Sequence, residues 1–160
     1  MSPQLRAATA QDAAAIAEIY NQIIRDTTIT FAPVEKSETE IAAQITEADA
    51  YLVACDGAQV VGFASFAPFR KGLGYSRVKE HSICLAQGVR GAGLGAQLLR
   101  ALEDAALVRG VTHMIAGVSG ENAAGQKFHA RHGYQTVGHL PEIGQKFGRR
   151  IDLVLMQKTL

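Results

Sequence analysis

The chain has 160 residues, 48% hydrophobic and 19% charged, which is enough for one globular domain with a real core. Its 16 Lys and Arg nearly balance 15 Asp and Glu, so the net charge of +1 gives no overall field to attract nucleic acid or a membrane surface. No apolar run reaches the roughly 18 residues of a membrane helix, and the first residues lack the apolar core of a signal peptide. We therefore expect one soluble, cytoplasmic domain over 1–160, with neither a nucleic-acid nor a membrane partner.

The first third of the chain predicts a strand followed by two helices. A short strand is expected over 5–8, and apolar residues at helical spacing continue from Thr9 to about Arg25. Ser37, with Glu40 three residues later, matches the capping box that opens a helix, here one reaching about residue 48. The apolar face of the first helix is expected to cover a sheet.

The middle of the chain predicts three strands. Apolar runs over 51–55 and 60–66 flank Asp56-Gly57, a strong hairpin signal. A loop is expected over 68–74 and a third strand over 75–85. A glycine-rich turn and a patterned helix follow directly, so the third strand should deliver the chain into that turn.

The second half continues with alternating helices and strands. The expected elements are a helix to about Gly110, a strand over 111–118, a short helix from Asn122 to about His132, and strands over 134–140 and 150–157 joined by a loop over 141–148. Seven strands and four helices in this order predict a mixed α/β domain. Its antiparallel strands come first, and a βαβ unit surrounds the glycine turn.

The glycine turn is the strongest functional signal. Gly91, Gly93 and Gly95 alternate with nothing larger than Ala92 and Leu94, so the backbone can approach a ligand and present its N–H groups. The following helix has its positive N-terminus at this turn, and Arg90 adds a full charge. The pattern predicts a phosphate site.

Two common phosphate-binding families fit this turn poorly. The run GAGLGA matches a dinucleotide fingerprint, but the strand after the helix ends in Ser119 and Gly120 where an acidic residue is required. A Walker-type lysine is also absent from the turn.

The spacing Arg90-x-x-Gly93-x-Gly95, between an apolar strand and a helix, resembles motif A of the GNAT superfamily of acyl-CoA N-acyltransferases. The resemblance covers nearly the whole chain and implies the GNAT-like fold with acetyl-CoA as co-substrate. It implies that Leu85, Ala86 and Gln87 hold pantetheine and that Asn122 belongs to a second coenzyme element. The pyrophosphate would be held by Arg90, Gly91, Ala92, Gly93, Leu94, Gly95, Ala96, Gln97 and Leu98.

Other residues narrow the resemblance. His129 stands where many family members have Tyr, and with Glu80-His81-Ser82 and the tail over 144–157 it looks like the phosphinothricin and methionine sulfoximine acetyltransferase branch. That branch implies acetyl transfer to a small amino acid analogue and a homodimer. Arg150 departs from its usual Trp, and Gln87-Gly88 from a Pro-containing pair. Another amine, such as a polyamine or a peptide N-terminus, and a non-catalytic acyl-CoA-binding module remain alternatives.

Acetyl transfer to an amine requires a base, and the departing thiolate requires a proton. Glu80 is the candidate base; the alternative is a solvated acid paired with Lys79 or Arg77. His129 is the candidate acid or stabiliser of the tetrahedral intermediate, or else a packing residue. His81 should face away from Glu80 because strand residues alternate, so a structural role is expected.

The amine site is less clearly marked. Arg70 or Arg77 would pair with a substrate carboxylate, or both are solvated loop charges. Phe31 and Tyr75 would line the apolar side, and the loop carrying Lys146 would close the site, even from a second subunit.

Neither cysteines nor histidines suggest a metal site. Cys55 and Cys84 lie in apolar runs and are expected to be reduced and buried. His113, His132 and His139 lack the spacing of metal ligands, and the expected chemistry needs no metal.

Overall fold

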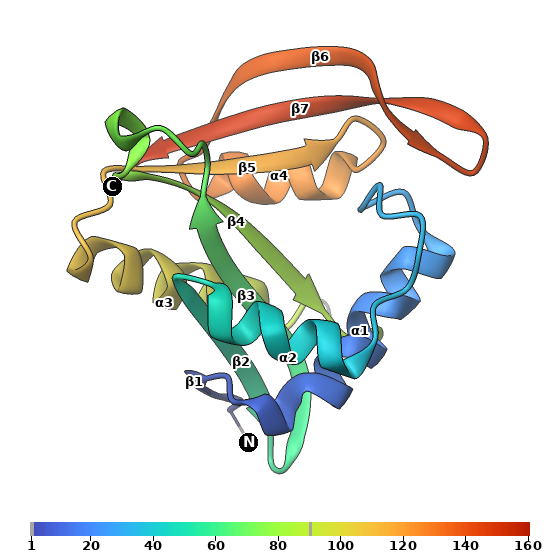
Figure 1. Cartoon of the computed structure of the whole chain (residues 1–160), viewed down its shortest axis with the longest axis vertical. Coiled ribbons are helices and arrows are strands. Elements are labelled where there is room, and N and C mark those ends of the chain that lie inside the picture. Colours follow the sequence, from blue (N-terminus) through green and yellow to red (C-terminus); the bar gives the residue numbers. More distant parts are fainter. Residues whose placement is uncertain (1, 90) are drawn as a thin grey trace.

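The computed structural model describes residues 2–89 and 91–160 and is built on one sheet (Figure 1). The sheet has the order β1-β2-β3-β4-β5-β7-β6, and its neighbouring strands are antiparallel except β4 and β5. Its strands are β1 (Gln4–Ala7), β2 (Ala50–Asp56), β3 (Gln59–Pro68), β4 (Val78–Leu85), β5 (His113–Ser119), β6 (Gln135–Lys146) and β7 (Arg149–Thr159). The seven strands and four α-helices of the described residues confirm the predicted mixed α/β class.

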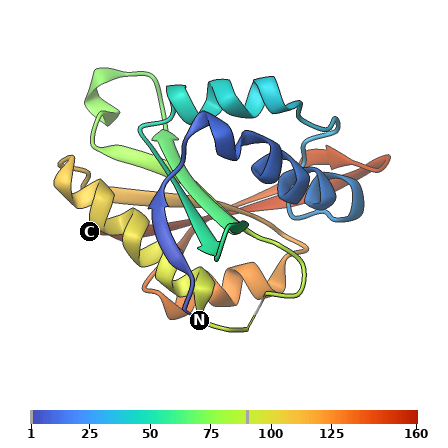
Figure 2. The same cartoon turned by 90° about the horizontal axis from the view of Figure 1, so that it is seen from below.

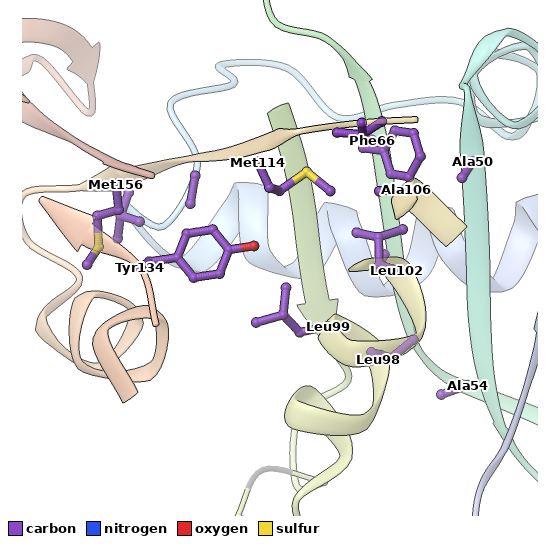
Figure 3. Close-up of a cluster of buried hydrophobic side chains, with 14 of the residues drawn as sticks. Ala50, Ala54, Phe66, Leu98, Leu99, Leu102, Ala106, Met114, Tyr134 and Met156 are labelled. Carbon is purple, nitrogen blue, oxygen red and sulfur yellow. The ribbon is translucent and has the colours of Figure 1, made fainter. Parts of the chain in front are cut away.

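The helices lie on both faces of the sheet, as Figure 2 shows. They are α1 (Ala13–Asp26), α2 (Glu38–Glu47), α3 (Leu94–Val108) and α4 (Ala123–Arg131), and a short 3-10 helix, η1 (Ala10–Asp12), leads into α1. The core under α3 contains Leu98 and Leu102 packed against Phe66 and Met114 (Figure 3). A second core lies under α1 and α2 on the other face. Each face of the sheet therefore packs against apolar side chains of the helices, as expected for a sheet between two helical layers.

The predicted caps and turns are present. Ser37 Oγ accepts from Glu40 N–H at 3.1 Å, and Glu40 Oε2 accepts from Ser37 N–H at 2.7 Å. Asn122 Oδ1 accepts from Gly125 N–H at 2.9 Å and opens α4. Gly133 follows α4 with φ of +91°, a conformation that favours glycine. Local polar side chains and glycine therefore set where these elements begin and end.

Two predicted boundaries were wrong. Tyr75 belongs to a short 3-10 helix, η2 (Leu73–Tyr75), and β4 begins only at Val78. The predicted loop over 141–148 is mostly strand, because β6 continues to Lys146 through an irregularity between Leu140 and Gly144. The stretch begins with Pro141, and β6 lies at the sheet edge, where proline and bulges are tolerated.

An opening between β4 and β5 positions the functional site. Their parallel pairing covers four positions and ends at His81 and Ala116. Beyond this point β4 stays paired with β3 as far as Leu85, while β5 stays paired with β7 as far as Ser119. Figure 1 shows the two strands diverging. The sheet therefore has a V-shaped gap at the end where β4 enters the glycine turn.

Candidate active site

The glycine turn takes the conformation that its sequence predicts. Gly91 and Gly93 have φ of +90° and +77°, and Gly93 is the N-cap of α3. The helical hydrogen bonds begin where Gln97 N–H donates to Gly93 O at 3.1 Å. The N–H groups of Leu94, Gly95 and Ala96 precede that bond and are left for an anion at the helix start.

A cleft of about 420 Å³ lies beside this turn, between the end of β4 and helix α4. Gly91, Gly93 and Gly95 line one side and Asn122 and Phe128 another. A β-carbon at Gly95 would lie 3.3 Å from Phe128 Cε2, so glycine at this position keeps α3 and α4 close. The cleft joins the N-terminus of α3 to a largely apolar channel.

A second cavity of about 210 Å³ fills the gap between β4 and β5. It shares lining residues with the cleft, namely Ile23, Ile29, Ile83, Cys84, Asn122 and His129. Phe31, Ser82 and Ser119 line its other parts. A ligand held in the cleft can thus reach the gap in the sheet, where a second molecule can meet it.

Glu80 lies at the edge of this second cavity. It precedes the lining residues of β4, and a β-carbon on the lining residue Gly117 would lie 3.9 Å from Glu80 Oε2. Within the described residues, the Glu80 carboxylate has no hydrogen bond or ion pair, and the neighbouring Lys79 donates to Asp49 at 2.6 Å instead. Although the residue is exposed, the surrounding protein desolvates the Glu80 carboxyl and raises its pKa. An unpaired carboxylate with a raised pKa is suited to accept a proton near neutral pH.

His81 and His129 form a buried pair. Their Nε2 atoms are 2.9 Å apart and their rings stack with centroids 5.1 Å apart. His129 Nδ1 lies 2.8 Å from Gly125 O, so this nitrogen carries a proton. Burial is the main cause that lowers the pKa of both rings, that of His81 to about 3. The neutral pair therefore has one arrangement, in which His81 Nε2–H donates to His129 Nε2.

This arrangement leaves one polar atom unsatisfied. His81 Nδ1 is buried and lacks a hydrogen-bond partner within the described residues. The unpaired atom stays a lone pair because the single proton of the ring is on Nε2. Both N–H groups of the pair are committed, so neither is free to point into the cavity.

The family of the chain follows from a match over most of its length. Residues 16–134 match the model of the acetyltransferase (GNAT) family. The match includes the glycine turn, α4 and the residues of β4 that line the two cavities. The chain belongs to the GNAT acetyltransferase family. Its fold agrees with that of solved members, and it is an N-acetyltransferase by family and by relatives.

Three similar proteins illustrate the range of acceptors in this acetyltransferase family. An L-methionine sulfoximine/L-methionine sulfone acetyltransferase of Pseudomonas aeruginosa is 37% identical, covering 100% of this chain and 96% of the relative. A phosphinothricin acetyltransferase from Sinorhizobium meliloti in complex with acetyl-CoA is 32% identical with a TM-score of 0.94, covering 100% and 89%. A ribosomal-protein-alanine N-acetyltransferase from Brucella melitensis is 35% identical with a TM-score of 0.93, covering 98% and 99%.

Most of the predicted coenzyme residues of this acetyltransferase lie in or beside the cleft. Leu94 and Leu98 are buried in the core, so only their backbone can contribute. Gln87 accepts a hydrogen bond from Gln22 and lines a neighbouring cavity together with Leu85. Arg90 lies outside the described residues. The other predicted coenzyme residues lie at the end of β4, in the turn and in the first turn of α3, namely Ala86, Ala92, Ala96 and Gln97.

The predicted amine-site residues do not gather. Phe31 lines the second cavity, but the Arg70 guanidinium lies 5.4 Å from the ring centroid of the exposed Tyr75, in the connection before β4. Arg77 directly precedes β4, and its carbonyl accepts from Thr112 N–H at the closed end of the β4–β5 ladder. Lys146 is buried and bonded to two backbone carbonyls. A role of Arg70, Tyr75, Arg77 or Lys146 in binding the amine stays a prediction.

Several cavity residues gave no separate signal in the sequence. Ser82 and Ser119 line the second cavity, as do Tyr20 and Thr30. The sequence could have predicted Ser82, because residues two apart on a strand share a face and Glu80 lies two positions before it. Thr30 and Tyr20 reach the cavity through the packing of a helix and its following segment on the sheet, which no local pattern reports.

Proposed function

We propose that the chain transfers the acetyl group of acetyl-CoA to the amino group of a small amino acid analogue of the phosphinothricin, methionine sulfoximine or methionine sulfone type. The observation that carries this proposal is the continuity of the two cavities. One begins at an anion-binding helix start, the other ends beside an unpaired carboxylate, and six residues line both. This arrangement suits a thioester that enters from one side and an amine from the other.

The coenzyme would lie along the cleft with its pyrophosphate at the start of α3. The N–H groups of Leu94, Gly95 and Ala96 would bind the phosphate oxygens, with Arg90 as a further cation. The pantetheine arm would follow the backbone at Leu85 to Gln87, and Asn122 would lie beside it. The residues present fit the group because the turn has glycine where the backbone has a left-handed conformation.

Glu80 would supply the base. It takes a proton from the substrate ammonium, directly or through a water, and the free amine attacks the thioester carbon. A C–N bond would form and the C–S bond would break, after which the new amide nitrogen must lose its second proton and the departing thiolate must gain one. Because both N–H groups of the neutral histidine pair already have acceptors, the proton released by the nitrogen would reach the thiolate through water.

The test is release of free thiol from acetyl-CoA in the presence of a panel of amines. The expected result is release with methionine sulfoximine, methionine sulfone or phosphinothricin, and acetylated product of the matching mass. The panel also contains spermidine and an alanine-initiated peptide. Activity on either of these, with none on the amino acid analogues, overturns the substrate assignment and leaves the acetyltransferase class intact.

A peptide N-terminus is the second candidate acceptor, because one relative of nearly equal similarity is named as a ribosomal-protein-alanine N-acetyltransferase. The cavity volume of about 210 Å³ favours the smaller acceptor.

We also propose a homodimer. Val137, Ile143 and Phe147 on the β6–β7 hairpin are more than half exposed, which suits a surface covered by a second copy. Sedimentation equilibrium would measure this, and a monomer at micromolar concentration would contradict it.

A further inference from the structure

The segment over 27–31, between α1 and α2, forms one wall of the acceptor cavity. Ile29, Thr30 and Phe31 line that cavity directly. The segment contains no helix or strand, so contacts with the rest of the molecule must hold it. The closest of these contacts come from β6, more than a hundred residues away in the sequence.

Lys146 makes the first of these contacts. Its Nζ donates to the carbonyl oxygens of Thr27 and Thr30 at 2.7 and 2.8 Å, and it lies 5.0 Å from the ring centroid of Phe147. The residue is only 4% exposed, and burial lowers the pKa of its ammonium. A buried ammonium needs acceptors for its protons, and here the backbone of the 27–31 segment supplies them. Two of its three N–H groups are thus committed to holding this segment.

Gly144 makes the second contact, two residues earlier on the same strand. A β-carbon at this position would overlap the Phe31 ring. The absence of a side chain at Gly144 therefore lets the Phe31 ring pack against β6 while Phe31 lines the cavity. Gly144 and Lys146 both follow the irregularity in β6, which sets the register of this end of the strand against β7.

We propose that Lys146 and Gly144 are positioning residues that set the wall of the acceptor cavity by holding the 27–31 segment, and that Lys146 is not a ligand of the amine. The inference deepens the proposed function and rests on it, since it assumes that the amine occupies this cavity. It assigns selectivity for the acceptor to a contact between β6 and the segment after α1.

The first experiment is the steady-state kinetics of Lys146→Met, with the best amine of the panel. Methionine has a similar length but leaves the carbonyls of Thr27 and Thr30 without their donor. The KM for the amine should rise about tenfold, while kcat and the KM for acetyl-CoA change less than about twofold. Lys158→Met is the matched control, because it removes a partly buried lysine that pairs with Glu103 and lines neither cavity. It should leave the KM for the amine unchanged.

A pair of substrates separates positioning from direct binding. The wild type and Lys146→Met are compared on an amino acid analogue and on its carboxamide, which lacks the charged carboxylate. If Lys146 positions the wall, kcat/KM falls by the same factor for both acceptors. If the ammonium binds the carboxylate, the wild-type preference for the acid disappears in the variant, and the inference is overturned.

Gly144→Ala tests the second contact without removing a hydrogen bond. The added methyl group should displace Phe31 and raise the KM for the amine, and replacing the ring in the double variant Gly144→Ala/Phe31→Leu should recover part of the loss. Gly138→Ala is the control on the same strand, because its β-carbon would meet only ordinary contacts, the nearest at 3.7 Å. No effect of Gly144→Ala on amine kinetics would overturn this contact's role. This variant also carries the test if Lys146→Met does not fold.

Hydrogen–deuterium exchange gives a readout that does not depend on turnover. Amides over 27–32 should exchange at least about tenfold faster in Lys146→Met than in the wild type, with Lys158→Met as control. Unchanged exchange there overturns the proposal. If the wild type acetylates none of the small amines but exchange still responds, the proposed acceptor fails while the link between β6 and the segment stands.

Discussion

The coenzyme side and the acceptor side of the active site are built in different ways. The coenzyme side is formed largely by the end of β4, the glycine turn and the start of α3, which follow one another in the sequence, together with α4, and its anion site consists of backbone N–H groups. The acceptor side combines residues of α1, the 27–31 segment, β4, β5 and β7, and it presents side chains. A shared coenzyme needs one fixed backbone shape, whereas the choice of acceptor can vary with single side chains.

This difference predicts which kinetic constant each substitution will change. A change at the glycine turn should affect the KM for acetyl-CoA, and a change at the 27–31 segment should affect the KM for the amine. Glu80 lies at the edge of the acceptor cavity and is the proposed base, so its loss should affect turnover and neither affinity. The following substitutions test this separation, beginning with the largest expected effect.

Glu80→Gln should lower kcat by about 10²-fold or more while both KM values change little. Glutamine keeps the size of the side chain but cannot accept the ammonium proton. In the wild type, kcat/KM should fall as the pH drops through the raised pKa of Glu80, because the base must be ionised. The variant should lack this fall. The measurement is a pH–rate profile by thiol release.

Glu18→Gln, an exposed acid on α1, is the control for the loss of a negative charge. It should behave as the wild type. A Glu80→Gln enzyme with wild-type turnover would remove Glu80 from the base role. A raised KM for acetyl-CoA would show that Glu80 belongs to the coenzyme side instead.

Gly93→Ala should raise the KM for acetyl-CoA about five- to tenfold and leave the KM for the amine unchanged. Gly93 has φ of +77°, where a β-carbon is strained, so the helix start should shift and the variant should also lose about 1 kcal/mol of stability. Gly57→Ala introduces the same strain at φ of +60° in the β2–β3 hairpin, away from the cleft. If both variants weaken acetyl-CoA binding equally, the effect is one of stability alone.

The two sides also differ in how far the sequence predicts them. The order of elements, the caps at Ser37 and Asn122 and the conformation of the glycine turn follow from local patterns, and all are present. These features depend on residues within a few positions of one another, so a single sequence contains the information. Predicting a phosphate site at the start of α3 needed nothing beyond this.

The acceptor side was predicted less well because its contacts join distant residues. Arg70 and Arg77 are close to Glu80 in sequence, but a β-strand separates positions by about 3.3 Å per residue, and both precede β4 at the closed end of its ladder with β5. Lys146 was expected to lie in a loop, and only the continuation of β6 past its irregularity directs it to Thr27 and Thr30. No local pattern gives such a register.

His81 shows the same limit inside a correctly predicted strand. Strand alternation predicts that His81 and Glu80 point to opposite faces of the sheet. The partner of His81 on α4, His129, depends on how that helix packs on the sheet. The pair is buried, and the low pKa of His81, about 3, means that the folded state excludes a proton that the unfolded chain binds. The free energy of unfolding should therefore decrease as the pH falls below about 6.5, by up to about 1.4 kcal/mol per pH unit for this one group.

His81→Phe should be less stable at pH 7, because His129 Nε2 loses its donor, but its stability should depend less on pH between 6.5 and 5. The groups that face His81 are the rings of His129 and Tyr134, and His129, whose pKa is also lowered, keeps part of the pH dependence. Urea unfolding at pH 7, 6 and 5 measures the slope. An equal slope in the variant and the wild type would contradict the assignment of His81 as a neutral ring.

Arg149→Met should have the smallest effect on the KM for the amine. It compares an exposed ion pair with the buried Lys146, since both contact the 27–31 segment. Arg149 pairs with Glu121, and Glu121 Oε1 accepts from Thr28 Oγ1 at 3.0 Å, so this pair also reaches the 27–31 segment. The Arg149 and Glu121 side chains are 52% and 38% exposed. Exposed ion pairs contribute about 0–1 kcal/mol and weaken with salt.

The expected change in the KM for the amine is therefore less than about twofold, and it should vanish at high ionic strength. Lys146 is buried, so water cannot take the place of the two backbone carbonyls that accept its hydrogen bonds, and its hold on the segment should not depend on salt. The measurement is the KM of Arg149→Met and Lys146→Met at low and high salt. If the exposed pair matters as much as the buried lysine, the segment is held by its surface charges, and burial on β6 is not what fixes the acceptor wall.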